Sequence, residues 1–243
     1  MGKRKMVEEE RELSVVVPAY NEAGNIAEVL ENAVRSLDAS AIDFEINVVN
    51  DGSDDSTGRI LEELRAANRR VRVLTHNCNR GYGAALRSGM AAATGTHVLV
   101  SDGDGQFQMD QFQAIWRRRH DADMVLGYRD PRKDPLHRRV AGWIYNHAVV
   151  PLFFGVRLRD VNCGFKLISR RVIADLRLRS TGALISAELL AAAKRRGATH
   201  VEVGVKHFPR RSGRATGLML RVVLKALREL PATCASVLRQ TAV

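Results

Sequence analysis

The 243-residue chain lacks several features that would place it in a specialised class of protein. It has only three cysteines, odd in number and far apart, so a disulfide framework is not expected and a reducing compartment is favoured. No apolar run reaches the roughly 18 residues that a membrane-spanning helix needs. The N-terminus has no apolar signal-peptide core. These absences predict a cytoplasmic protein.

The composition is globular, with 45% hydrophobic and 27% charged residues, and the length suits one large α/β domain. The net charge of +11 is unevenly placed. Residues 1–128 hold 15 Lys/Arg and 20 Asp/Glu, whereas residues 129–243 hold 23 and 7. A basic second half favours a phosphate-rich partner, for which nucleic acid and an anionic membrane surface both qualify. Aromatic residues are only 5%, which is few for stacking on nucleic-acid bases.

Strands and helices alternate in the first half of the chain. Strands are expected at residues 13–17, 44–49, 71–74 and 97–100, and helices at 23–37, around 60–64 and at 84–93. This alternation predicts an α/β fold with an open, mostly parallel central sheet and helices on both faces. Ligands bind beyond the carboxyl ends of the strands in such sheets. Polar residues follow three of these strands, at 18–22, 50–53 and 101–106, and should converge on one edge.

The second half is less regular. The expected elements are an interfacial helix or hairpin at 140–156, an edge strand at 165–168, a helix at 184–195, a strand at 201–205, and an amphipathic helix at 218–230 that Pro231 ends. Basic residues interleave with the apolar residues of the last helix, and further arginines flank the segment at 140–156. Basic residues beside apolar interfacial helices favour binding to anionic lipid headgroups.

Asp102, Asp104 and Gln106 carry the strongest chemical signal. In extended backbone, alternate residues point to the same side, so two carboxylates and an amide oxygen would line one face. These are hard oxygen ligands, which suit Mg²⁺ or Mn²⁺. A metal held there could grip a diphosphate and neutralise its charge as it leaves. Asp51, at the end of another strand, could accept hydrogen bonds from a base or ribose.

Several stretches together resemble the family-2 inverting glycosyltransferases with a GT-A fold, and most of all the dolichyl-phosphate or polyprenyl-phosphate mannosyltransferases. They are VVVPAYNE (15–22), VVNDGSDDST (48–57), NRGYGAALRSGM (79–90), SDGDGQ (101–106), DVNCGFKLISRR (160–171) and FPRRSGRATG (208–217). The resemblance implies a Rossmann-like catalytic domain at 13–216, with a nucleotide-sugar half (13–128) and an acceptor half (129–216). A charged N-terminus (1–12) precedes it, and an amphipathic helical segment (217–243) follows.

The resemblance also implies roles for individual residues. The predicted sets are Pro18, Tyr20, Glu22, Asp51 and Asp102 for the nucleotide-sugar, Asp102, Asp104 and Gln106 for the metal, Arg129, Arg138 and Arg210 for the acceptor phosphate, and Asp104 and Arg129 for catalysis. Three places depart from the family pattern, one of which is Ala215-Thr216-Gly217 in place of the usual Ser-Lys. Gly142 stands where a serine is usual, and Cys163 replaces another serine.

We therefore expect a peripheral enzyme on the inner face of the membrane. It would move mannose or a similar hexose from a GDP- or UDP-sugar to polyprenyl phosphate or another lipid acceptor. A phosphate monoester has its second pKa near about 6, so this acceptor is largely dianionic and needs no general base. Two alternatives stay open: transfer to a hydroxyl of a glycan, lipid or small molecule, with Glu188 or His207 as base, and a basic nucleic-acid-binding protein. The main hypothesis, transfer to a lipid phosphate, expects no nucleic-acid partner.

Overall fold

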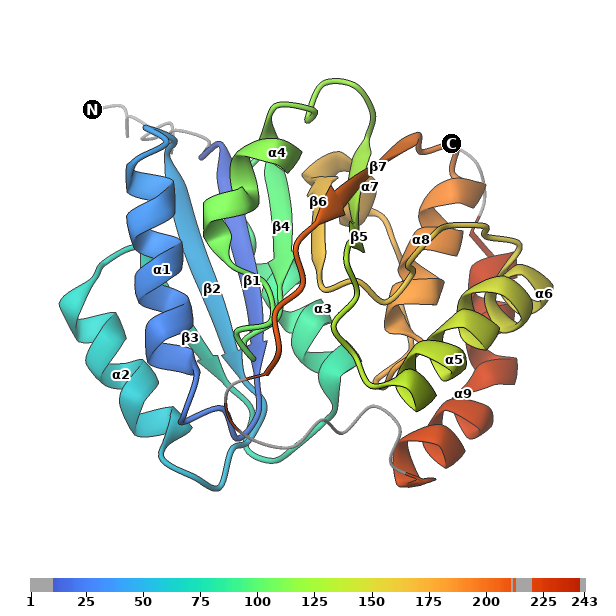
Figure 1. Cartoon of the computed structure of the whole chain (residues 1–243), viewed down its shortest axis with the longest axis horizontal. Helices are drawn as coiled ribbons and strands as arrows, with labels where there is room; N and C mark the ends of the chain where they lie inside the picture. The colour runs from blue at the N-terminus through green and yellow to red at the C-terminus, as the bar shows by residue number, and fades with distance from the viewer. Residues whose placement is uncertain (1–10, 211, 213–219, 241–243) are drawn as a thin grey trace, which may run out of the picture.

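The structure is a computed structural model, and it describes residues 11–210, 212 and 220–240. A seven-stranded sheet of order β3-β2-β1-β4-β6-β5-β7 runs through the described residues (Figure 1). The strands are β1 (Leu13–Ala19), β2 (Phe44–Asn50), β3 (Val71–Thr75), β4 (His97–Ser101), β5 (Met124–Arg129), β6 (Phe165–Ser169) and β7 (His200–Val205). The predicted terminus 1–12 lies largely outside the described residues, as does the predicted boundary at 216/217.

The strands of the first half are all parallel, which places their carboxyl ends on one edge. β1 pairs with β2 on one side and with β4 on the other, and β2 pairs with β3. All seven residues of β1 and of β2 are buried, as expected of strands covered on both faces. β6 runs antiparallel to both β4 and β5, while β5 and β7 are parallel to each other.

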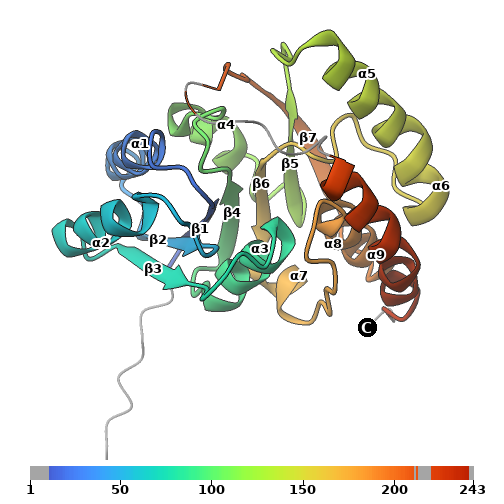
Figure 2. The ribbon, with the colours of Figure 1, turned by 90° about the horizontal axis from the view of Figure 1, so that it is seen from below.

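Helices cover both faces of the sheet, as predicted (Figure 2). The core on one face combines residues of β1 and β2 with α1 (Ile26–Asp38), α2 (Thr57–Ala67) and α4 (Phe112–Trp116). The core on the other face includes residues of α3 (Tyr82–Ala92), α6 (Val150–Phe154), α8 (Ile185–Arg195) and α9 (Leu220–Leu238). Short segments η1 (Met109–Gln111) and α7 (Arg170–Ala174) complete the described elements.

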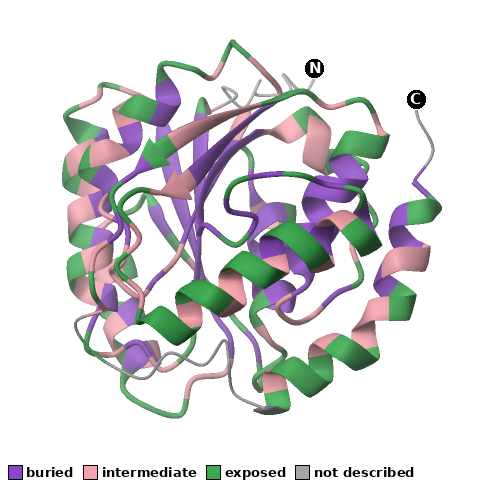
Figure 3. Ribbon diagram, turned by 45° about the vertical axis from the view of Figure 1, so that its right-hand side comes forward, coloured by how far each residue is buried: buried purple, intermediate pink, exposed green. Residues whose placement is uncertain are grey.

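The apolar segment predicted at 140–156 is helical. It consists of α5 (Leu136–Ile144), the π-helical turn η2 (Tyr145–Val149) and α6, which follow one another without a break. Much of its outer side, like that of α9, is exposed (Figure 3). Among the described residues, no helix has both the length and the apolar character to cross a bilayer.

Two expectations about the second half need correction, and two elements near the middle of the chain were not expected. The strand expected at an edge is β6, which lies inside the sheet between β4 and β5. Pro231 does not end the last helix, because α9 continues to Leu238 while packing against α8. A proline inside a helix removes one backbone donor and crowds the carbonyl four residues before it, at a cost of about 3 kcal/mol, which the packing of α9 against α8 helps to offset. Both β5 and α4 were missed entirely.

Candidate active site

The carboxyl edge of the parallel strands gathers most of the predicted nucleotide-sugar residues. Pro18 is buried within β1, Asp51 directly follows β2, and Asp102 directly follows β4. Glu22 lies in the turn between β1 and α1, where its N–H donates to the Thr57 hydroxyl at 2.9 Å. Tyr20 is exposed beside them. The parallel register of β1, β2 and β4 is what brings these residues together.

Asp102 is closely surrounded by Tyr82 and Gly164. The Tyr82 hydroxyl donates to its Oδ1 at 2.9 Å. A Cβ added to Gly164 would lie 1.9 Å from its Oδ2, so only glycine leaves room for this carboxylate. Burial raises the pKa of Asp102, and the hydrogen bond from Tyr82 opposes that rise. Neither Tyr82 nor Gly164 was singled out from the sequence as a site residue.

Asp104 belongs to a turn rather than to extended backbone, which corrects the geometric reason given for its position. The chain turns over residues 103–106, with φ of +74° at Gly105, and Asp104 Oδ1 accepts the Gln106 N–H at 3.0 Å. Burial and the neighbouring charge of Asp102 raise the pKa of Asp104 to about 6. The side-chain nitrogen of Gln106 donates to the Phe208 carbonyl at 3.2 Å, tying this turn to the segment after β7.

Arg210 bridges the carboxylates of this edge. Its guanidinium pairs with Glu22, and its Nη1 lies 3.4 Å from Asp104 Oδ2. Asn25 also donates to Glu22 at 2.7 Å. Burial raises the pKa of Glu22, and the contacts with Asn25 and Arg210 oppose this rise. Arg210, predicted for the acceptor phosphate, thus lies against Glu22 and Asp104, two carboxylates predicted for the nucleotide-sugar and the metal, and its neighbour Arg211 is outside the described residues.

Asp51 is occupied by protein donors. His76 Nδ1 lies 2.6 Å from its Oδ1, the Arg80 N–H donates to the same oxygen at 3.0 Å, and the Gly81 N–H donates to Oδ2 at 2.7 Å. These contacts anchor the loop before α3 to the end of β2. His76 was missed, because a histidine one residue beyond β3 carries no signal in sequence.

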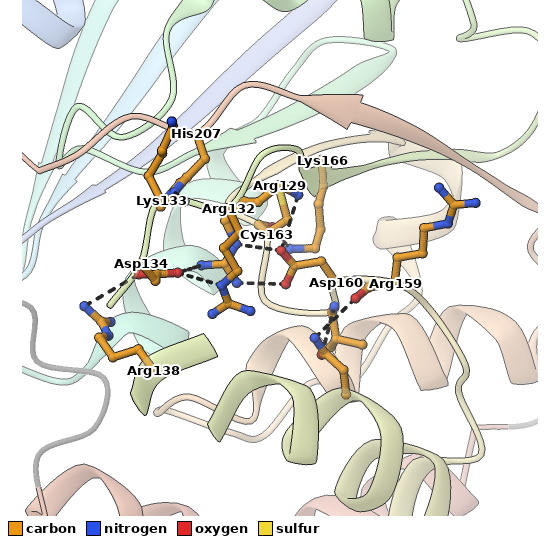
Figure 4. A network of polar contacts seen from close by, with 12 residues as sticks. Arg129, Arg132, Lys133, Asp134, Arg138, Arg159, Asp160, Cys163, Lys166 and His207 are labelled. Atoms are coloured by element: carbon orange, nitrogen blue, oxygen red, sulfur yellow. Dashed lines mark hydrogen bonds and ion pairs between the residues drawn. The ribbon is translucent and has the colours of Figure 1, made fainter. Parts of the chain in front are cut away.

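A second cluster lies where β5 ends (Figure 4). Arg129 grips Asp160 with two hydrogen bonds, from Nε at 2.6 Å and Nη2 at 2.8 Å. Its Nη1 donates to Asp134 Oδ2 at 3.2 Å. Burial would raise the pKa of Asp160, but these bonds from Arg129 hold it below its usual range. Buried charges of opposite sign are paired here, as they must be away from water.

Asp134 is shared by two further arginines. Arg132 Nε donates to its Oδ2 at 2.7 Å, and Arg138 Nη1 lies 3.9 Å from its Oδ1. Lys166 is buried behind the cluster and donates to the Cys163 carbonyl, and burial lowers its pKa. Three arginines therefore meet two carboxylates, which leaves surplus positive charge. Arg132, Asp134, Asp160 and Lys166 were not predicted as site residues.

The residues at the carboxyl ends of β1, β2 and β4 have the chemistry to hold a divalent cation. Asp102 and Asp104 are adjacent hard-oxygen donors, and the guanidinium of Arg210 already places a positive charge against Asp104. Among the described residues, no three His, Cys, Asp or Glu side chains are grouped as a metal site. A cation here would therefore take its remaining ligands from other groups, such as Gln106 or a bound diphosphate.

The family model described as Glycosyl transferase family 2 matches residues 14–177. The chain belongs to this family. The expected GT-A fold is confirmed as well. Glucosyl-3-phosphoglycerate synthase from Mycobacterium tuberculosis, in complex with Mn²⁺ and UDP-glucose, aligns with a TM-score of 0.67 at 21% identity, over 93% of this chain and 79% of that one.

Three curated relatives give the family its context. Glycosyltransferase AglD of Haloferax volcanii is 36% identical and shares 68% of this chain and 28% of its own. A dolichyl-phosphate beta-glucosyltransferase of Drosophila melanogaster is 31% identical, with 68% and 56% covered. A dodecaprenyl-phosphate galacturonate synthase of Rhizobium johnstonii is 28% identical, with 69% and 50% covered. This family-2 chain thus spans about half or less of the length of these relatives.

Proposed function

We propose that this family-2 chain transfers a hexose from a nucleotide diphosphate sugar to polyprenyl phosphate at a membrane surface. The observation that carries the proposal is the segment 160–166, which joins the two clusters. Asp160 holds Arg129 at one end, and Gly164 makes room for the Asp102 carboxylate further along. A donor bound at the strand ends and an anionic acceptor bound at the arginines would therefore be neighbours. Relatives named for dolichyl and dodecaprenyl phosphate support the choice of acceptor.

The residues on each side have distinct tasks. Asp102, Asp104 and Gln106 would hold Mg²⁺ or Mn²⁺, which would neutralise charge on the leaving diphosphate. Asp51 and Glu22 shape the nucleotide side through their contacts with the loop before α3 and with Arg210. An acceptor phosphate oxygen would attack the anomeric carbon opposite the leaving group and invert it.

Proton transfer from the acceptor is not needed if that acceptor is a phosphate dianion. The arginines then act by positioning the phosphate and balancing its charge. Neither base considered for a hydroxyl acceptor is well suited to that task. Glu188 is fully buried, and its carboxylate accepts the Arg179 and Ser180 N–H groups. Burial, with the charge of Arg129, lowers the pKa of His207 to about 4, which makes it a weak base.

A membrane surface fits the exposed apolar residues of the second half. The large apolar side chains left exposed on α5, α6 and α9 are Leu136, Val140, Trp143, Ile144, Leu152, Phe153, Val223, Leu224, Leu227 and Leu238. Lys225 and Arg228 lie among those of α9. Apolar residues alternating with basic ones bind the headgroup region of anionic bilayers. We propose that this surface docks on the inner face of the cytoplasmic membrane.

The test is a screen of GDP- and UDP-sugars with Mg²⁺ or Mn²⁺, using polyprenyl phosphate and the matching polyprenol as acceptors. We expect transfer to the phosphate and none to the alcohol. Asp104→Ala should abolish the metal-dependent transfer and weaken Mn²⁺ binding in isothermal titration calorimetry. Transfer to the alcohol at an equal rate would contradict the acceptor assignment, and full activity of Asp104→Ala would contradict the metal assignment.

A further inference from the structure

The side chain of Arg132 is held at its Nε and open at its far end. Nε donates to Asp134 Oδ2 at 2.7 Å, and the side chain is 21% exposed. Within the described part of the chain, no hydrogen-bond acceptor lies against its two terminal nitrogens. A guanidinium carries five N–H donors in a planar fork, so the free edge of Arg132 presents donors suited to an oxyanion.

Gly142 on α5 leaves the space that this fork occupies. A Cβ added at position 142 would lie 2.5 Å from Arg132 Nη1 and 2.8 Å from Nη2. Helix interiors disfavour glycine by about 1 kcal/mol relative to alanine. The glycine has an ordinary helical backbone, so conformational freedom does not explain it. The space that the guanidinium of Arg132 occupies explains the glycine.

The side chains around Asp134 carry a net positive charge, which favours the binding of an anion. Arg129, Arg132 and Arg138 all approach this one carboxylate, and among the described residues Arg129 alone of the three also forms an ion pair with Asp160 (Figure 4). Burial would raise the pKa of Asp134, but the hydrogen bond from Arg132 and the charge of Arg129 hold it below its usual range. Asp134 therefore stays ionised and fixes the arginines without neutralising all of them.

We propose that Arg132 is a further ligand of the acceptor phosphate, and that Asp134 and Gly142 are positioning residues for it. The inference rests on the proposed function. Arg132 donates from its terminal nitrogens to the phosphate oxygens beside Arg129, while its Nε stays on Asp134. Two guanidiniums on one phosphate favour the dianion over an uncharged headgroup, so Arg132 sets the selectivity for phosphate over alcohol acceptors.

The first test compares Arg132→Gln with Arg139→Gln, which removes the same charge from an exposed neighbouring position of α5. The acceptor is a water-soluble short-chain prenyl phosphate. For Arg132→Gln we expect the acceptor KM to rise about tenfold or more, since hydrogen bonds to charged groups are worth that much. The donor KM should stay close to that of the wild type, and the melting temperature should fall only modestly, because Asp134 keeps its hydrogen bond from Arg129. Arg139→Gln should match the wild type in both KM values.

The second test uses Gly142→Ala, alone and with Arg132→Gln. The added methyl group displaces the fork of Arg132, so the acceptor KM rises although alanine favours the helix and the melting temperature does not fall. In the Arg132→Gln background, Gly142→Ala should add less than twofold. One outcome is a wild type that transfers sugar to the prenyl phosphate while Arg132→Gln and Gly142→Ala both leave the acceptor KM unchanged. That result would refute the role of Arg132 and leave the proposed function standing. A wild type inactive on prenyl phosphate with every donor sugar would overturn both.

Discussion

Gly164→Ala gives a direct test of the donor pocket, because it adds one methyl group beside Asp102 and changes no charge. The new Cβ would lie 1.9 Å from Oδ2 and 2.3 Å from Cγ of Asp102. Neither separation is possible, so the carboxylate must turn away. The Tyr82 hydroxyl, now 2.9 Å from Oδ1, then loses its acceptor. The backbone at Gly164 has no positive φ and accepts alanine without strain.

The expected losses of stability and of Mn²⁺ affinity in Gly164→Ala follow from the displacement of the Asp102 carboxylate. Overpacking of this kind costs about 1–3 kcal/mol of stability, so the fold survives with a lower melting temperature. Disturbing the groups that orient a metal-binding carboxylate typically lowers metal affinity about 10- to 100-fold. We therefore expect Mn²⁺ and nucleoside diphosphate to bind about 10- to 100-fold more weakly, measured by isothermal titration calorimetry with Mn²⁺ and UDP, and with GDP in a parallel series.

Two control variants show whether weaker binding comes from the displacement of the Asp102 carboxylate. Gly182→Ala adds a methyl group whose nearest neighbour, Glu229 Oε2, is 3.4 Å away, so it should leave both stability and nucleotide affinity close to the wild type. Tyr82→Phe removes only the hydroxyl bond and should cost less affinity than Gly164→Ala. Unchanged binding of Mn²⁺ and both nucleotides to a folded Gly164→Ala protein would show that Asp102 takes no part in donor binding.

Two further predictions concern the buried carboxylate of Glu45 and the proposed membrane-docking surface. Burial would raise the pKa of Glu45, but hydrogen bonds from Ser14, Thr94 and Arg72 lower it from 4.5 to about 2, so at neutral pH this carboxylate contributes about 3 kcal/mol. Because the folded-state pKa is depressed, Glu45→Gln should lower unfolding free energy most above pH 4.5, and the difference should shrink between pH 4.5 and 2 in urea titrations. Leu152→Glu, at a side chain 77% exposed, should reduce flotation with anionic vesicles severalfold, whereas Ala66→Glu on α2 should not; equal flotation of both would count against the docking surface.

Sequence patterns placed the strand ends around Asp51 and Asp102 well because the positions of these strands have a local cause. The β-branched runs of β1, β2 and β4 end at polar residues, and the expected strands differ from the observed ones by no more than two residues. Parallel pairing then follows from the helices between these strands. The order of strands and helices along the chain is therefore enough to bring Asp51 and Asp102 to one edge.

Features that depend on distant partners could not be read in this way. β6 looks like an edge strand by itself, and only its pairing with both β4 and β5 puts it inside the sheet. Arg210 meets Glu22 across 188 residues, and the room for Arg132 depends on Gly142 ten positions along the chain. Asp104 faces the site through a turn, although the expectation relied on extended backbone.

The contacts of the arginines that we propose for phosphate binding are the most informative of these differences. A pocket for two phosphate-bearing substrates needs strong positive charge, yet an unpaired buried arginine would destabilise the folded protein. Here Asp160 and Asp134 hold Arg129 and Arg132, and Glu22 holds Arg210. Each guanidinium is thereby fixed in direction before a substrate arrives, which reduces the entropy lost on binding. Under the proposed function, the same carboxylates leave a small surplus of positive charge, which a dianionic acceptor would balance and a neutral headgroup would not.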